Sequence, residues 1–199
     1  MKKNRSPKKL YKVPFYIEKV LNVESWLNNS RELIKTADTF ENDLNILWGP
    51  ITNYKKIDDT RPKLHTSQVI YFMLIAYAIE NMCKAVIVHK KRSKIKDEIK
   101  KKGKLPSFLK THNLVNLVTD GTGLTINDQE EELLYRLERH SVWAAKYPVP
   151  TAFEDIDTHK ILPGGKEIFV SYLHCEDNKR IKSLVIKIDD NVKSILKNN

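Results

Sequence analysis

Apolar positions recur along much of the chain at intervals of three and four residues, the spacing that gives a helix one buried face. The first such run predicts a helix over about residues 17–47, which Trp48-Gly49-Pro50 ends because glycine favours the left-handed cap and proline cannot continue the helix. The segment 51–64 is then a connector. Thr66 or Ser67 can cap a second run that is apolar around most of its circumference. Such a helix must be enclosed by neighbours, so we expect it to be the central helix of the core, with its tail continuing into a basic stretch.

Cap and stop residues predict two further helices in the middle of the chain. Ser107 can cap a short helix that Gly121 and Gly123 close. Asn127 or Asp128, followed by acids that favour the positive end of the helix dipole, can cap a longer one that stops at Tyr147-Pro148. We expect the leucines and Trp143 of this longer helix to face inward.

The C-terminal pattern predicts a last helix that begins near Asp177 or Asn178. Before it, the β-rich run 168–173 fits either a short strand or the start of a helix, and the pattern does not decide between them. Five helices without an internal repeat favour an all-α, up-and-down helical bundle over residues 15–199. Residues 1–14, which end at Pro14, are expected to form a flexible basic arm.

The composition fits one globular domain with a localised positive charge. The 199 residues are 41% hydrophobic, and 35 Lys and Arg against 25 Asp and Glu give a net charge of +10. Residues 1–12 carry six bases and no acid, and residues 90–104 carry nine bases against two acids. The rest of the chain is therefore slightly acidic, and the excess charge belongs to two short segments.

Cofactor and membrane signals are weak in this sequence. Cys83 and Cys175 are too few for a disulfide framework and lack metal-binding spacing, which favours a reducing, cytoplasmic setting. No zinc-peptidase, P-loop or dinucleotide-binding motif is present, so we expect neither a metal nor another cofactor. No apolar run reaches the roughly 20 residues of a membrane span, and no apolar segment follows the basic N-terminus as in a secretory signal. We therefore expect no membrane association.

Three parts of the chain carry a family resemblance. They are W-L-N-N-S-R-E-L-I-K-T-A (26–37), A-Y-A-I-E-N-M-C-K-A-V (76–86) followed by T-H-N-L-V-N-L-V (111–118), and W-A-A-K-Y-P (143–148). In this order they resemble the HEPN superfamily, the helical bundles found in prokaryotic toxins, defence systems and nucleotidyltransferase partners. The resemblance implies a HEPN-like bundle in a prokaryotic defence, toxin–antitoxin or stress setting, commonly as a homodimer.

The resemblance also bears on catalysis. Catalytic members of the superfamily resemble metal-independent ribonucleases that carry an Arg, four to six intervening residues and a His. No Arg of this chain has a His at that spacing, and Arg136 with His140 comes near it with three residues between. The departure implies a non-catalytic or degenerate module that binds RNA or a protein partner. The alternative is a metal-independent endoribonuclease in which Arg136 or Arg139 stabilises the developing charge and His140 acts as the base, although their helix is acidic.

Glu80 and Lys84 form a second candidate site. They lie four residues apart on the most apolar helix and can pair on one face. One interpretation is an internal ion pair that fixes the register of the helices. The other is a nucleotide or small-ligand pocket that they line with His112 and the acidic helix, together with Lys146 and Tyr147, where related sequences often read Arg-Tyr-Pro.

The basic stretch between the second and third predicted helices is the third candidate. Its proposed phosphate-binding residues are Lys90, Lys91, Arg92, Lys94, Lys96, Lys100, Lys101 and Lys102. Nucleic acid is the first functional interpretation, and a solvated lysine-rich loop is the alternative. Because the stretch contains no aromatic residue, we do not expect base stacking from it.

Overall fold

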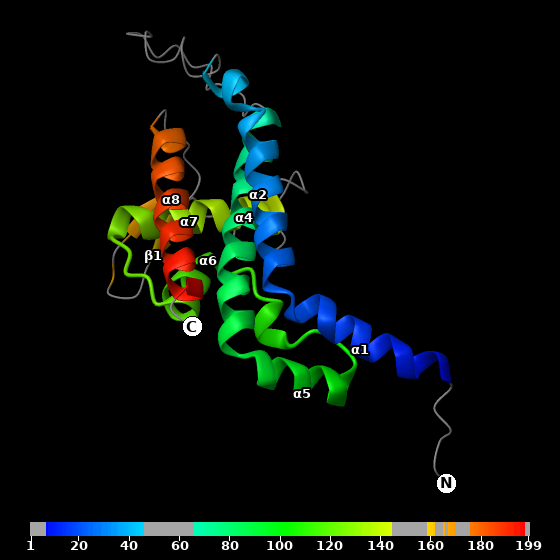
Figure 1. Ribbon diagram of the computed structural model, residues 1–199. Helices are drawn as coiled ribbons and strands as arrows, with labels where there is room; N and C mark the ends of the chain where they lie inside the picture. The colour runs from blue at the N-terminus through cyan, green and yellow to red at the C-terminus, as the bar shows by residue number, and fades with distance from the viewer. Residues whose placement is uncertain are drawn as a thin grey trace, which may run out of the picture.

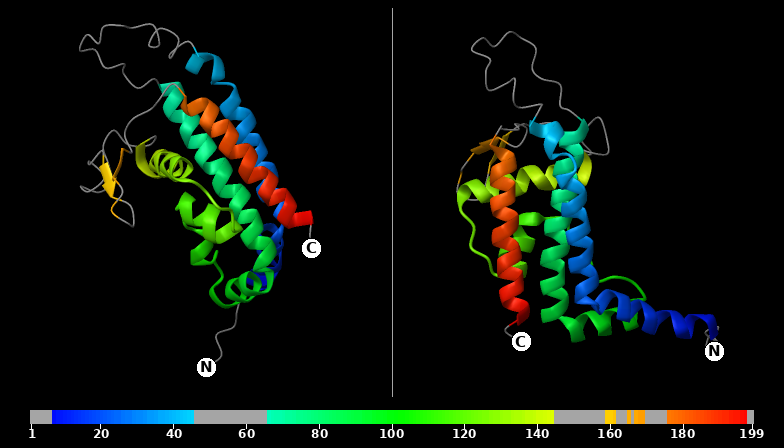
Figure 2. Two further views of the ribbon diagram at one scale, coloured as in Figure 1. Left: turned by 90° about the vertical axis from the view of Figure 1, so that its left-hand side faces the viewer. Right: turned by 45° about the horizontal axis from the view of Figure 1, so that its top comes forward.

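The fold is a helical bundle in which three long helices lie side by side. The computed structural model describes residues 7–45, 66–144, 159–161, 165, 167–169 and 176–197. The long helices are α2 (Val23–Asp38), α4 (Thr66–Lys90) and α8 (Asp177–Lys197). α2 runs antiparallel to α4, and α8 runs in the same direction as α4 (Figures 1 and 2). The predicted all-α class is confirmed.

Shorter elements complete the bundle. α1 (Pro7–Leu21) and α5 (Arg92–Lys102) lie at one end, whereas α7 (Asp128–Arg139) crosses the long helices (Figure 1). A 3-10 turn (Ser107–Leu109), α6 (Leu114–Asn116) and a π turn (Leu117–Gly121) lead into α7, which a second π turn (His140–Ala144) extends. The antiparallel strands β1 (His159–Ile161) and β2 (Glu167–Phe169) pair with Lys160 opposite Ile168.

The central helix α4 is buried on nearly all sides. Its fully buried side chains include Phe72, Ile79 and Val86, and α2, α7 and α8 all pack against it. The helix is long and apolar enough to cross a membrane, but 72% of its most apolar window is buried inside the fold. It is therefore the core helix that the sequence predicts, and its enclosure replaces the contact with lipid that an isolated apolar helix would need.

The N-terminal part differs from the single helix predicted over 17–47. The chain is already helical from Pro7, with Pro14 inside α1, although residues up to Pro14 were expected to form the arm. α1 ends at Leu21, and Asn22, whose side chain accepts a hydrogen bond from the Ser25 backbone N–H at 3.0 Å, caps α2. The apolar spacing of the sequence does not reveal this break, because an asparagine cap hardly disturbs that spacing. Residues 41–45 are helical, and the expected Trp48-Gly49-Pro50 stop and the connector lie outside the described residues.

The predicted continuation of α4 into the basic stretch is also wrong. The chain bends at Lys91, and α5 begins as a separate helix at Arg92. Only Ile95 and Ile99 of α5 are buried. They lie one turn apart, so α5 packs through a narrow stripe. It ends at Gly103, whose φ of 67° is the left-handed conformation that glycine adopts without strain.

The helix caps in the second half are closer to expectation. Asn127 and Glu130 form the reciprocal capping box that starts α7, with Asn127 Oδ1 accepting from the Glu130 backbone N–H at 2.9 Å. The short helix predicted from Ser107 is instead a 3-10 turn followed by α6, which Asn113 caps. α8 begins at Asp177 as predicted. β2 resolves the open alternative at 168–169 in favour of a strand, and residues 170–173 lie outside the described part.

A buried ion pair joins α7 to the first turn of α8. Arg136 Nη1 and Nη2 donate to Asp177 Oδ2 and Oδ1 at 2.5 and 2.9 Å, and both side chains are 1% exposed. This two-pronged geometry pairs two guanidinium nitrogens with both carboxylate oxygens at once. The pair therefore fixes where α8 starts relative to α7.

We expect Asp177→Asn to lower the free energy of unfolding by about 3–5 kcal/mol, because it removes the negative charge 2.5 Å from the buried Arg136 guanidinium and leaves the more distant Glu132, 3.7 Å from Arg136 Nε. Urea denaturation followed by circular dichroism measures the change. The control is Glu41→Gln, which removes a carboxylate paired with Lys182 where both side chains are more than 40% exposed. That variant should lose less than about 1 kcal/mol. Equal losses in the two variants would contradict the structural role of the Arg136–Asp177 pair.

Candidate functional site

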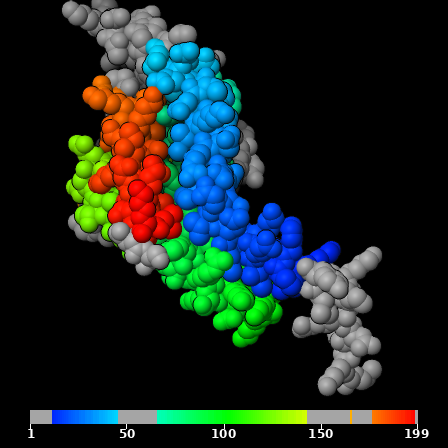
Figure 3. All heavy atoms as spheres, in the orientation of Figure 1, coloured from blue at the N-terminus to red at the C-terminus, as the bar shows by residue number. Residues whose placement is uncertain are grey.

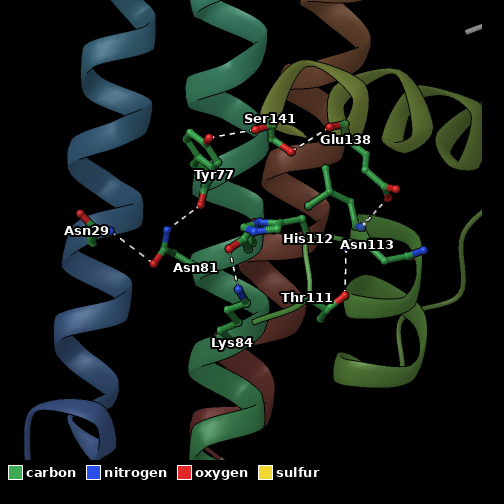
Figure 4. A network of polar contacts seen from close by, with 11 residues as sticks. Asn29, Tyr77, Asn81, Lys84, Thr111, His112, Asn113, Glu138 and Ser141 are labelled. Carbon is green, nitrogen blue, oxygen red and sulfur yellow. Dashed lines mark hydrogen bonds and ion pairs between the residues drawn. The ribbon is translucent and has the colours of Figure 1, made fainter. Parts of the chain in front are cut away.

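Glu80 is at the centre of a polar network inside the bundle. Its Oε1 pairs with Lys84 Nζ at 2.5 Å, and its Oε2 lies 2.8 Å from His112 Nδ1 (Figure 4). The side chains of Lys84 and Glu80 are 4% and 10% exposed, whereas that of His112 is 52% exposed. The three predicted pocket residues therefore lie together, with only the imidazole reaching the surface.

The loop before α6 places His112 against α4. The Asn113 backbone N–H donates to Thr111 Oγ1 at 3.2 Å, and the Asn113 side chain caps α6. At the next residue, the Leu114 backbone N–H donates to Glu138 Oε2 on α7 at 2.9 Å (Figure 4). The loop is thus tied to α7 on one side of His112, while Glu80 holds the imidazole on the other.

The network continues through α4 to both of its neighbours. Tyr77 Oη donates to the Ser141 backbone carbonyl at 2.9 Å. On the opposite side, Ser30 Oγ of α2 donates to the Ala78 carbonyl at 2.9 Å, and the side chains of Asn29 and Asn81 meet at 3.3 Å (Figure 4). The polar residues of α4 therefore connect α2 to the turn after α7.

The arrangement defines what this network can do chemically. A carboxylate only accepts hydrogen bonds, so His112 donates from Nδ1 to Glu80. Both oxygens of Glu80 are engaged within the protein. An incoming ligand would have to break one of these contacts to reach the carboxylate, which favours the interpretation as an internal ion pair. Lys146 and Tyr147, the other predicted pocket residues, lie outside the described residues.

Two of the three predicted catalytic residues, Arg136 of α7 and His140 of the following π turn, are buried in the core. Arg136 is held by Asp177, and His140 is 7% exposed and stacks on Phe72 with ring centroids 5.1 Å apart. Arg136 and His140 follow Leu133 and Leu137 at helical spacing, so they share the inward stripe instead of the exposed acidic face. In the sequence, the helical spacing of Arg136 and His140 with Leu133 and Leu137 was the signal that both residues face the core. Arg139 is half-buried beside them.

His140 is also electrostatically unsuited to gaining a proton. Burial, together with the positive charges of Arg139 and Arg136, lowers its pKa to about 4. Its Nδ1 meets no hydrogen-bond partner in the part of the chain that the structure describes. The imidazole is therefore neutral near pH 7 and shielded from solvent.

The third candidate forms a separate surface, which we call the basic lobe: α1, α5 and the junction residues Lys90 and Lys91. Arg92 Nη1 donates to the Leu21 carbonyl at 3.0 Å and so ties the start of α5 to the end of α1. The two helices adjoin at one end of the molecule, outside the face formed by α2 and α8 (Figure 3). All eight predicted phosphate-binding residues belong to this lobe and are exposed.

Two hollows flank the crossing of α1 and α5. One, of about 830 Å³, lies between apolar Val13, Ile17 and Leu21 of α1 and the cationic Arg92, Lys96 and Lys100 of α5. The other, of about 440 Å³, is lined by Lys12, Val13, Phe15, Tyr16, Ile99 and Gly103. The sequence analysis did not place α1 beside α5. The signal for it was the spacing of Val13, Ile17 and Val20, which gives α1 an apolar face of its own.

Neighbouring rings and acids hold some cations of the lobe. Lys91 and Lys94 Nζ lie 5.5 and 5.4 Å from the centre of the Phe108 ring, close enough for cation–π attraction. Lys102 pairs with Glu98 at 3.1 Å. Among the residues that the structure describes, Lys96, Lys100 and Lys101 form no ion pair, so their charges are available to a ligand.

Metal binding has no geometric support in the described residues, where no group of three or more His, Cys, Asp and Glu side chains is placed to hold an ion. Cys83 is buried, and its pKa is raised to about 12 by burial and by Glu80, against a smaller lowering by Lys84. A thiol so far from ionisation is neither a nucleophile nor a ligand at neutral pH.

Comparison with known proteins adds no family assignment. No protein-family model, curated protein or solved structure matches the chain. The HEPN resemblance therefore stays a prediction that rests on the short motifs of the sequence.

We expect His140 to make folding stability depend on acid pH. An unfolded histidine has a pKa near 6.5, above the value of about 4 in the fold, so protons bind the unfolded chain first. The stabilisation is complete above pH 6.5 and declines by about 3 kcal/mol as the pH falls to 4. Urea denaturation of the protein and of His140→Phe across this range measures the contribution. Parallel stability profiles for the two proteins would contradict it.

Proposed function

We propose that the protein binds RNA through the basic lobe, as a non-catalytic module. The observation that carries this proposal is the exposure of α5: two isoleucines anchor the helix, and its six bases all face solvent against only Asp97 and Glu98. Like charges at this density repel one another, and binding of a polyanion would relieve that repulsion. Phosphate is the partner whose charge complements this surface.

The geometry of the lobe suits a phosphate backbone. An 11-residue helix is about 16 Å long, so its cations can meet several successive phosphates. Lys12 and Lys19 of α1 are exposed as well, which extends the positive surface across the crossing of the two helices. Because lysine is a flexible point donor, this surface provides affinity for the backbone and little selection of sequence.

The other two candidate sites, around Glu80 and around Arg136, are better explained as structural contacts than as ligand-binding sites. Glu80 is paired with Lys84 and His112, and Arg136 is paired with Asp177, so these groups already have internal partners. The alternative endoribonuclease needs Arg136 or Arg139 and His140 to reach a ribose phosphate, and two of the three are buried. The proposal therefore contains no catalytic step.

The biological setting of the proposal comes from the family resemblance. A HEPN-like module that binds RNA fits a cytoplasmic protein of a prokaryotic defence, toxin–antitoxin or stress system. The superfamily commonly pairs, so the proposal includes a homodimer.

We expect RNA affinity to fall steeply with salt and with the loss of lobe cations. Lys96→Gln, Lys100→Gln and Lys101→Gln together should weaken binding of a fluorescent oligonucleotide by about tenfold or more and reduce the slope of log K against log salt by about two. Glutamine keeps the helix propensity close to that of lysine, so α5 should remain folded. Fluorescence anisotropy between about 50 and 200 mM salt measures both quantities.

The matched control removes the same charge elsewhere. Lys35, Lys179 and Lys182 are exposed on α2 and α8 toward the end of the bundle opposite the lobe (Figure 1), and their joint change to glutamine should leave affinity within about twofold. Binding that is absent, insensitive to salt or equally weakened by the control triple would overturn the proposed function.

A further inference from the structure

The basic lobe exposes two adjacent aromatic rings that the core does not use. Phe15 and Tyr16 of α1 are 60% and 37% exposed. In the described part of the chain, the other large apolar side chains exposed to this extent are Val142 and Ile186, neither of which is aromatic. Solvent-exposed aromatic side chains are costly to hydrate, so their pairing on one helix turn beside cations calls for a partner.

The rings lie where the cations of both helices converge. Phe15 and Tyr16 line the same hollow as Lys12 of α1 and as Ile99 and Gly103 of α5. Val13 lines both this hollow and the larger one, which Lys96 and Lys100 also line, so the hollow that holds the rings adjoins cations of α5. Lys19 Nζ lies 5.4 Å from the centre of the Phe15 ring, which steadies that ring from its own helix. The stretch 90–104 has no aromatic residue, and α1 brings aromatic rings to it.

Aromatic rings and cations together select one form of nucleic acid. In a duplex the base faces are stacked inside, and only phosphates and groove edges meet a protein surface. In a single strand the bases are free to stack on aromatic side chains while lysines take the phosphates. We propose that the basic lobe binds single-stranded RNA, with unpaired bases stacked on Phe15 and Tyr16 and phosphates held by Lys12 and the lysines of α5. This inference rests on the proposed function and names its ligand class.

Stacking on these rings would make binding tolerant of sequence. Every base has a π face, whereas the described lining of the hollow offers Lys12 as its one charged group and no carboxylate or amide side chain to read a base edge. The expected ligand is therefore an unpaired stretch of RNA, and pyrimidine or purine content should change affinity only modestly.

The test compares a labelled 15-nucleotide oligouridylate with a blunt duplex RNA of the same length at one salt concentration. The protein should prefer the single strand. The double variant Phe15→Ala, Tyr16→Ala should lose about tenfold or more in affinity for the single strand and less than about twofold for the duplex. Phe15→Leu, Tyr16→Leu keeps apolar side chains on α1 and should lose nearly as much, because leucine has no π face. Ile186→Ala, which removes a side chain 61% exposed on α8, should bind like the parent protein.

The outcomes separate this inference from the proposed function. Loss of binding to both ligands only in the Lys96, Lys100 and Lys101 triple, with unchanged single-strand affinity in both aromatic double variants, would overturn the stacking inference and keep RNA binding. A preference of the parent protein for the duplex would overturn it too. Absence of binding to either ligand would overturn both. Unchanged single-strand affinity together with loss of self-association would assign the two rings to contact between copies of the chain.

Discussion

The burial of α4 is the constraint on which the other elements depend. A helix of 25 residues that is apolar around its circumference cannot face water on any side, so the rest of the chain has to surround it. α2 and α8 cover it along its length, and α7 and its π turn cross it. Each isoleucine, leucine or phenylalanine removed from water in this way contributes about 1.5–3 kcal/mol, which makes this enclosure the main favourable term of the fold. The outer helices therefore need only one apolar stripe each, and their remaining faces are left to solvent or to a partner.

The charged groups inside this core are paired with opposite charges. Glu80 is placed between Lys84 and His112, and Arg136 meets Asp177 through two hydrogen bonds. These two sets join elements far apart in the sequence: α4 to the loop before α6, and α7 to the start of α8. Removing one member leaves an uncompensated charge, so the sets act as registers that fix one packing of the helices. The residues that suggested a catalytic or binding site in the sequence thus stabilise the packing of the helices. The exposed cations that can bind a ligand are concentrated in the basic lobe.

The sequence predicted the helices best where a single signal, apolar spacing or a helix cap, marks the element. Apolar spacing located α4 and α8, and the Asn127 cap located α7, because nothing competes with those signals. It failed at α1, where Pro14 and a run of cations obscured the apolar face of Val13 and Ile17, and at Asn22, where a cap divides two helices without disturbing the spacing. Proximity in sequence brought Arg136 and His140 together correctly but could not tell that their face turns inward. The meeting of Glu80, Lys84 and His112 was predictable in part from the four-residue spacing, whereas the pairing of α1 with α5 depends on contacts between segments about 80 residues apart.

The molecule therefore separates a closed polar interior from an open cationic surface, and the central claim is that ligands bind the surface. Backbone amide chemical shifts, followed by NMR while a short oligouridylate is added, test this most directly because one titration observes both candidate sites. The account predicts that the shifted amides lie in residues 12–21 and 90–103, and that residues 78–84 and 111–114 around Glu80 and His112 do not move. Shifts confined to the Glu80 network, with α1 and α5 unchanged, would contradict it.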